Sequence, residues 1–196
     1  MDSCFADIMV EFLAVAFHNI LYYASVYPKN VFETRRKYNI VVYQCIHPEI
    51  KQYIDLCLKS ASECLKAGQL HRIIFSVTNN KYEPLMKFVF DVSKNETFDD
   101  INDAYLVQVE QNLRAFCLQL SALSDKFRSL PEDVSFTINL HTTESTAVSM
   151  ATNPDFEEFP LVEVSELTQD TDIIVPIRSF PIRRFKLDTY IEMPTT

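Results

Sequence analysis

The chain's 196 residues, 47% of them hydrophobic and 23% charged, suffice for one domain with a substantial core, and no run of about 18 apolar residues predicts a membrane span. The formal net charge of −9 argues against a protein that reads duplex DNA directly, because such binding requires a concentrated positive face. The single glycine, Gly68, excludes phosphate-binding loops, dinucleotide fingerprints and nucleophile elbows, all of which depend on glycine, so an enzyme is disfavoured.

Residues 5–24 carry apolar side chains at every third or fourth position, which predicts a helix with a broad apolar face. The helix is expected to end before Pro28. Two short strands, Val31–Phe32 and Ile40–Cys45, are expected to flank the basic stretch "TRRKYN".

The stretch "HPEIKQYIDLCLKSASECLKAG" predicts a second helix with one apolar stripe. Pro48 fits the first helical position, and Gly68 is a natural stop. The next two runs, "HRIIFSVT" and "LMKFVFDV", alternate apolar and polar residues. Because the turn between them contains Asn79, Asn80 and Pro84, they predict an antiparallel hairpin.

Apolar residues at helical spacing from Leu106 to Leu123 predict a third helix, for which Thr97 is the expected cap. The following run, "VSFTINLHT", predicts a strand with one solvated face. Three helices and antiparallel strands together predict an α+β fold, with the helices packed on one face of the sheet.

The pattern changes after this strand, so the chain is read as one domain with a core at 1–143 and a C-terminal segment at 144–196. Residues 144–172 hold eight acids and no base. Three β-like pieces lie in the C-terminal segment: Leu161–Val164, Ile173–Ile177 and Ile182–Ile191. Pro176 and Pro181 would not fit a central strand, so these pieces are expected to pair with an edge of the core sheet or with a partner.

The residue types that usually carry catalysis or bind metals show no functional spacing. Four of the five cysteines lie within apolar patterns, as free buried thiols of an intracellular protein do, and no C-x-x-C is present. The carboxylate pairs Asp99-Asp100 and Glu157-Glu158 are interpreted as helix-dipole and surface charges. No catalytic residue, metal site or cofactor is therefore predicted, and the protein is expected to bind other proteins.

Several stretches together resemble the HORMA domain, in the branch that includes the accessory subunits of DNA polymerase zeta. They are "EFLAVAFHNILYYASVYP", "KYNIVVYQCIHPEIKQYI", "KFVFDV", "VEQNLRAF", "FTINLHT" and "VPIRSFPIRRFKLDTYIE". The resemblance implies that the C-terminal segment is a "safety belt", which folds over a partner peptide and pairs with the core sheet. The captured peptide would then add a strand to the sheet.

By this resemblance, Tyr53 corresponds to the aromatic residue that packs against the captured peptide. The belt stretch "EEFPLVEV", with Phe159 and Leu161, is expected to lie over it. Many relatives carry Trp where this chain has Leu161, so the peptide preference is expected to differ. From the apolar stripe of its helix alone, Tyr53 is equally interpreted as a core residue.

Ile174, Asp188 and Tyr190 match belt positions that in relatives contact the C-terminal domain of the scaffold Y-family translesion polymerase. Asp188 stands where relatives often carry Gln. Arg114 matches the arginine of the third helix that is used in HORMA–HORMA dimers. The simpler interpretations are edge-strand packing for Ile174 and Tyr190, and a solvated surface charge for Arg114.

The resemblance implies a non-catalytic adaptor of translesion DNA synthesis. It would join the catalytic subunit of DNA polymerase zeta, held through a proline-containing apolar peptide, to the scaffold polymerase. The location implied is nuclear, with the cytoplasm as a second site, and remodelling by an AAA+ ATPase would have only a short N-terminal tail to grip. The alternative is a spindle-checkpoint, DNA-repair or meiotic HORMA adaptor that binds a different closure-motif peptide. A small hydrolase or transferase and a direct DNA-binding protein are the rivals outside the family.

Overall fold

The computed structural model describes residues 3–94, 103–142, 173–182 and 185–194. The described helices are α1 (Ser3–Tyr23), α2 (Pro48–Ala67) and α3 (Asp103–Ala122), with short 3-10 turns at Lys29–Val31 and Ser124–Ser129. The strands are β1 (Phe32–Lys37), β2 (Ile40–Cys45), β3 (Leu70–Thr78), β4 (Pro84–Lys94), β5 (Ser135–Thr142), β6 (Ile173–Ile182) and β7 (Phe185–Met193). Helices and strands occur in the order that the sequence predicts.

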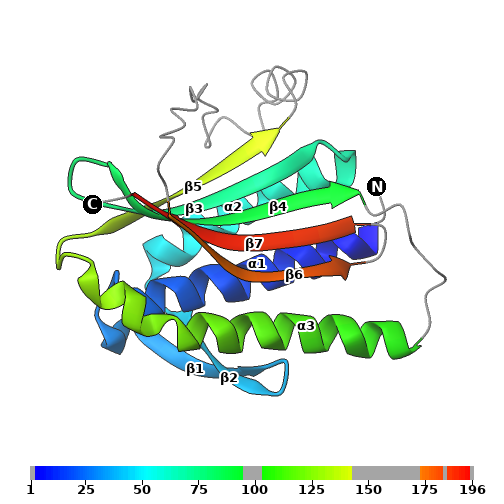
Figure 1. The fold of residues 1–196 in the computed structure, drawn as a ribbon, viewed down its shortest axis with the longest axis horizontal. Coiled ribbons are helices and arrows are strands. Elements are labelled where there is room, and N and C mark those ends of the chain that lie inside the picture. Colours follow the sequence, from blue (N-terminus) through cyan, green and yellow to red (C-terminus); the bar gives the residue numbers. More distant parts are fainter. Residues whose placement is uncertain (1–2, 95–102, 143–172, 183–184, 195–196) are drawn as a thin grey trace.

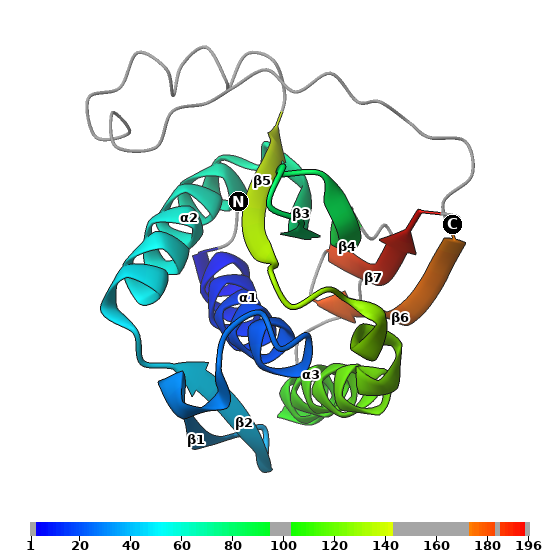
Figure 2. The ribbon, with the colours of Figure 1, turned by 90° about the vertical axis from the view of Figure 1, so that its left-hand side faces the viewer.

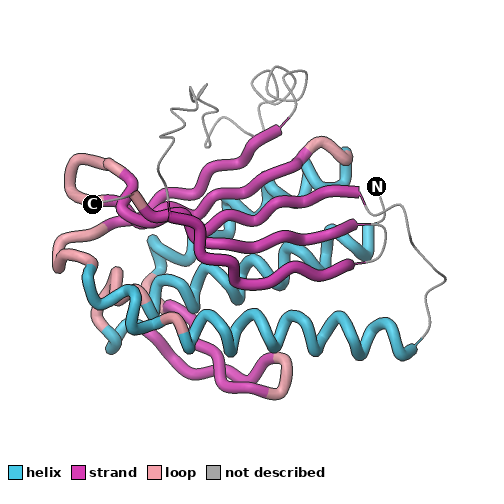
Figure 3. The backbone as a smooth tube through the Cα atoms, viewed as in Figure 1, coloured by secondary structure: helices cyan, strands magenta, loops and turns pink. Residues whose placement is uncertain are grey.

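Five of the strands form one antiparallel sheet in the order β5-β3-β4-β7-β6 (Figure 1). The helices lie on one face of this sheet, and β1 and β2 form a separate hairpin on the far side of α1 (Figure 2). Figure 3 shows the resulting α+β arrangement, in which the strands of the large sheet run side by side with two helices behind them and α3 below. The predicted fold class is confirmed.

Helix α1 is the centre of the core. Length and composition alone would allow it to cross a membrane, but in the fold its apolar side chains are buried between the sheet and the other helices. Phe12 meets Phe116 of α3 edge-on at 4.9 Å between ring centroids, and Phe17 lies 5.2 Å from Phe75 of β3. Burial of aromatic rings on every side explains why the apolar face predicted for this helix is so broad.

The β1–β2 hairpin is attached to α1 by polar side chains. The backbone N–H of Tyr43 donates to the Oδ1 atom of Asn19 at 3.2 Å, and the N–H of Cys45 donates to the Nδ1 atom of His18 at 3.3 Å. Both acceptors are buried. Side chains of α1 therefore accept hydrogen bonds from backbone N–H groups of β2 that would otherwise have no partner.

Two strand boundaries differ from the prediction. Strand β1 continues through the basic residues to Lys37, because its cross-strand partner β2 pairs with it along the whole length. Strand β6 runs without interruption from Ile173 to Ile182, through both Pro176 and Pro181. An edge strand tolerates proline because one side of its backbone needs no partner strand. Ile182, predicted from the sequence to begin the next strand, is the last residue of β6.

Candidate partner-binding sites

The outer edge of β5 is the first candidate site. Among the described strands, β5 pairs only with β3, and its other side forms one edge of the sheet. The next described strand, β6, lies at the opposite edge, so residues 143–172 connect two edges that are separated by β3, β4 and β7. A strand added beside β5 would therefore lie next to the start of a connection that leads to the far side of the sheet.

Tyr53 reaches this edge from α2. Its hydroxyl oxygen accepts the backbone N–H of Ile138 at 3.2 Å, and its ring meets Phe136 edge-on at 5.4 Å. In an antiparallel strand, alternate residues direct their N–H groups to opposite sides. The amide of Ile138 is therefore directed to the outer edge of β5, where the hydroxyl group covers it.

The phenol of Tyr53 stays neutral at ordinary pH. Burial raises its pKa to about 12. The ring is half-buried, packed against the core and beside the edge. Tyr53 thus packs against the core with its hydroxyl at the β5 edge, and the peptide contact that the resemblance implies stays a prediction.

Phe159 and Leu161, the other two residues predicted for the peptide site, lie outside the described residues, as does the predicted strand Leu161–Val164. The predicted cap Thr97 also lies outside them. These assignments stay predictions.

The outer face of the C-terminal hairpin, which we define as β6 and β7 on the side away from the helices, is the second candidate site. Cross-strand pairing places Ile174 beside Glu192 and Pro176 beside Tyr190, and Asp188 is two residues from Tyr190 on the same face. Ile174 is 62% exposed. The three residues predicted to contact the scaffold polymerase are therefore brought together on one face of the hairpin.

A polar cluster joins this face to the core sheet. The Tyr190 hydroxyl donates to the Oδ2 atom of Asp91 at 2.9 Å, and Arg72 holds the same carboxylate with contacts of 2.6 and 3.2 Å. Burial, followed by the Asp91 contact, raises the pKa of Tyr190 to about 12. Asp188 lies directly opposite Asp91 and is paired with Lys186 at 3.0 Å. Each acid of this like-charged pair therefore has its own cation.

Arg114 is exposed on α3, with the exposed apolar residue Leu118 one turn further along the helix. Burial raises the pKa of Tyr38, at the tip of the β1–β2 hairpin, and the Glu11 carboxylate of α1 raises it further.

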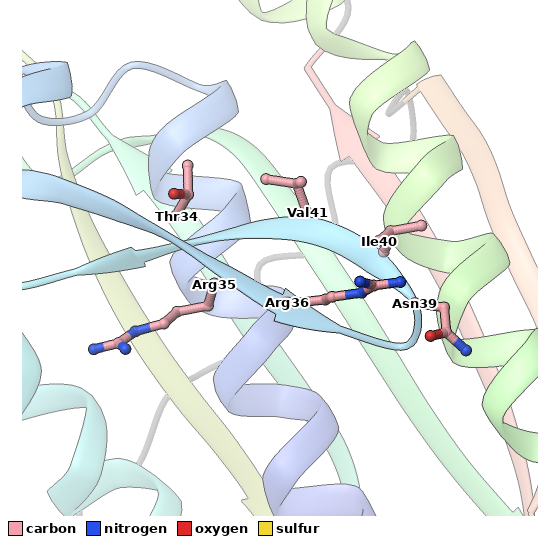
Figure 4. Close-up of a pocket in the computed structure, with 6 residues that line it drawn as sticks. All are labelled: Thr34, Arg35, Arg36, Asn39, Ile40 and Val41. Atoms are coloured by element: carbon pink, nitrogen blue, oxygen red, sulfur yellow. The ribbon is translucent and has the colours of Figure 1, made fainter.

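The described residues show a surface hollow and no cluster of metal-ligand side chains. No group of three or more His, Cys, Asp or Glu side chains in this part of the chain is placed to hold a metal ion. An open hollow lies on the β1–β2 hairpin (Figure 4), lined by Thr34, Arg35, Arg36, Asn39, Ile40 and Val41. These six residues include no carboxylate, His or Cys that could act as a general base.

Two contacts were not anticipated from the sequence. Arg178 of β6 donates to the side chain of Asn112 on α3, and Asp91 links Arg72 to Tyr190. The sequence could have pointed to Asn112, because it is a polar residue within the apolar stripe of its helix. The contacts of Asp91 depend on which strands pair, and no local pattern indicates that.

The HORMA domain family matches residues 6–170 of the chain. The human mitotic spindle assembly checkpoint protein MAD2B is 31% identical over 191 residues, covering 95% of this chain and 90% of the relative. DNA polymerase zeta subunit 2 of Drosophila melanogaster is 28% identical, with coverage of 95% and 96%. This chain belongs to the HORMA-domain family.

Solved structures agree with the fold of this HORMA domain. A chain in the crystal structure of the mitotic checkpoint complex matches with a TM-score of 0.83 at 20% identity, covering 97% of this chain and 98% of the other. The Caenorhabditis elegans protein HTP-2, bound to the HIM-3 closure motif, matches with a TM-score of 0.73 at 15% identity, with coverage of 97% and 90%.

Proposed function

We propose that this HORMA protein is a non-catalytic adaptor subunit of the translesion DNA polymerase zeta complex. Its safety belt, residues 144–196, would close over a proline-containing apolar peptide of the catalytic subunit, held against the core at 1–143. The name of the Drosophila relative supports the assignment to this polymerase. A nuclear location and remodelling by an AAA+ ATPase belong to the same proposal.

The observation that carries the proposal is the placement of β5 and β6 at opposite edges of the sheet. An unpaired edge offers main-chain donors and acceptors to an incoming strand, and a chain that passes from this edge to the other can enclose it. Tyr53 supplies an aromatic side chain at the same edge. Phe159 and Leu161 would contribute from the belt.

The outer face of the C-terminal hairpin would bind the C-terminal domain of the scaffold Y-family polymerase through Ile174, Asp188 and Tyr190. Their common face and the exposure of Ile174 support this assignment. Arg114 would contribute to HORMA homodimers or heterodimers, because an exposed guanidinium beside exposed apolar side chains suits a protein interface.

A checkpoint or meiotic adaptor is the second candidate function. The human relative is named for the spindle assembly checkpoint, and the HTP-2 structure contains the HIM-3 closure motif. The same β5 edge would then bind a different peptide, so the two functions differ in ligand and share the site.

The test is calorimetric titration of the full-length protein with the proline-containing peptide of its own polymerase zeta catalytic subunit. A checkpoint closure-motif peptide serves as the competitor. We expect the polymerase peptide to bind more tightly. A preference for the checkpoint peptide would favour the second function, and binding of neither peptide would contradict both.

Two substitutions at Tyr53 sharpen this test. Tyr53→Ala should weaken peptide binding by at least about tenfold, because it removes an aromatic anchor. Tyr53→Phe keeps the ring but releases the Ile138 amide for the peptide, so affinity should be retained or should increase by up to about tenfold. Thermal unfolding establishes that both variants are folded. Unchanged affinity in Tyr53→Ala would contradict the assignment of Tyr53.

A further inference from the structure

A β-bulge in β6 turns Arg178 toward the helices. Pro176 pairs with Tyr190 on the outer face, and the next paired residue, Arg178, lies opposite Thr189, so one extra residue, Ile177, is inserted between them. In a regular strand Arg178 would share the outer face with Pro176, because side chains alternate. The bulge instead places Ile177 and Arg178 both on the helix side.

Thr189 fixes the backbone at this bulge. Its Oγ1 atom accepts the N–H of Arg178 at 3.1 Å, and its hydroxyl donates to the Arg178 carbonyl oxygen at 2.7 Å. Thr189 is only 3% exposed. A buried hydroxyl that serves both backbone groups of one residue holds that residue in a single orientation.

The side chain of Arg178 ends on α3. Its Nε and Nη2 atoms donate to the Oδ1 atom of Asn112 at 3.2 and 2.7 Å. Asn112 is 8% exposed. A hydrogen bond from a charged donor is stronger than a neutral one, and a buried amide left without its donor is destabilised.

We propose that Arg178, Thr189 and Asn112 form a latch that holds the C-terminal hairpin against α3 and sets how rapidly the hairpin detaches. Backbone pairing with β4 and the burial of Leu187 and Ile191 hold β7 on the sheet. The latch adds a side-chain link to a second element, so α3 takes part in holding the hairpin. The consequence for a captured peptide rests on the proposed function: release of the hairpin would open the belt, and the latch would lengthen the lifetime of the bound peptide.

The first measurement needs no ligand. Amide hydrogen exchange of the full-length protein compares β7, at residues 185–193, with β3 as an internal reference. Arg178→Met keeps the length of the side chain but removes its donors. It should accelerate exchange in β7 by at least about tenfold relative to β3, because the lost hydrogen bonds have a charged donor and the buried Asn112 oxygen is left without a partner.

Asn112→Leu should have the same effect. Exchange of β7 in the double variant should be no faster than in either single variant, because both substitutions remove the same contact between Arg178 and Asn112. Lys186→Met is the matched control: it removes a cation from the same hairpin that is paired on the outer face. Because this ion pair is partly exposed, its loss should change the exchange of β7 by less than about threefold. Acceleration spread equally over β3 and β7, fully additive effects, or no acceleration would each overturn the latch.

The second measurement is the dissociation rate of the polymerase zeta catalytic-subunit peptide. Arg178→Met should accelerate dissociation by about the same factor as exchange, with Lys186→Met unchanged. If exchange responds but dissociation does not, the latch holds the hairpin without controlling the peptide, and that part of the proposal is wrong. If the wild-type protein does not bind the peptide, the proposed function fails, and the exchange measurement still decides the latch.

Discussion

At the scale of single residues, His18 shows how a buried polar group couples folding to pH. The imidazole Nδ1 atom accepts the Cys45 N–H, so the ring must be unprotonated at that nitrogen. The pKa of His18 is lowered to about 4, mainly by burial; the nearby Asp55 opposes this shift, and Lys51 adds to it. The folded protein therefore resists a proton that the unfolded chain accepts near pH 6.5.

We predict that His18 makes the folded state sensitive to mild acid. Its contribution is complete above pH 6.5 and is lost progressively as the pH falls from 6.5 to about 4, and the total change is about 3 kcal/mol. Urea unfolding of wild type and His18→Gln between pH 7 and 4.5 measures the difference in slope. His47→Gln, at an exposed histidine, should keep the wild-type slope. Parallel curves for wild type and His18→Gln would show that His18 does not titrate as described.

At the scale of elements, the sequence predicted those whose apolar pattern matches their burial. The stripe of α2, bounded by Pro48 and Gly68, and the alternation of β3 and β4 needed only local information. The path of β6 through its prolines did not follow from local pattern, because proline is acceptable only once the strand is known to lie at an edge. The position of β7 between β4 and β6 depends on contacts that are distant in sequence.

In the candidate sites, too, some features could be predicted from the sequence and others depend on tertiary packing. Tyr53 and the group Ile174, Asp188 and Tyr190 came from family resemblance, and the structure places the last three on one face. The covering of the Ile138 amide by Tyr53 could not be predicted, since it depends on how α2 packs against β5. The bulge that turns Arg178 inward likewise follows from strand pairing.

The end of α2 gives an element-scale prediction. Gly68 has a φ of 72°, and hydrogen bonds from Gly68 and Gln69 to Leu65 and Cys64 close the helix. Gly68→Ala should destabilise the fold by about 1 kcal/mol, because a side chain is disfavoured in the left-handed region. Gly68→Asn should reduce the free energy of unfolding by less than Gly68→Ala, since Asn tolerates the left-handed conformation. Urea unfolding at pH 7 compares the two, and an equal or larger loss for Asn would contradict the backbone explanation.

At the scale of the whole molecule, the two proposed partner sites lie on different parts of the sheet. The peptide site is the β5 edge beside α2, and the scaffold site is the outer face of β6 and β7 at the other edge. Strands β3 and β4 separate them. Since the sites share no described residue, the proposed bridging function would let one molecule hold both partners at once.

This separation predicts that the two binding reactions can be disrupted independently. Ile174→Ser should weaken binding of the scaffold polymerase C-terminal domain by about tenfold, because it removes an exposed apolar side chain from the proposed contact, and should leave peptide affinity unchanged. Tyr53→Ala should do the reverse. Leu118→Ser, which removes a comparable exposed apolar side chain from α3, should change neither affinity. Calorimetric titration of each variant with each partner measures all combinations, and loss of both affinities in Ile174→Ser would mean that the two sites are not separate.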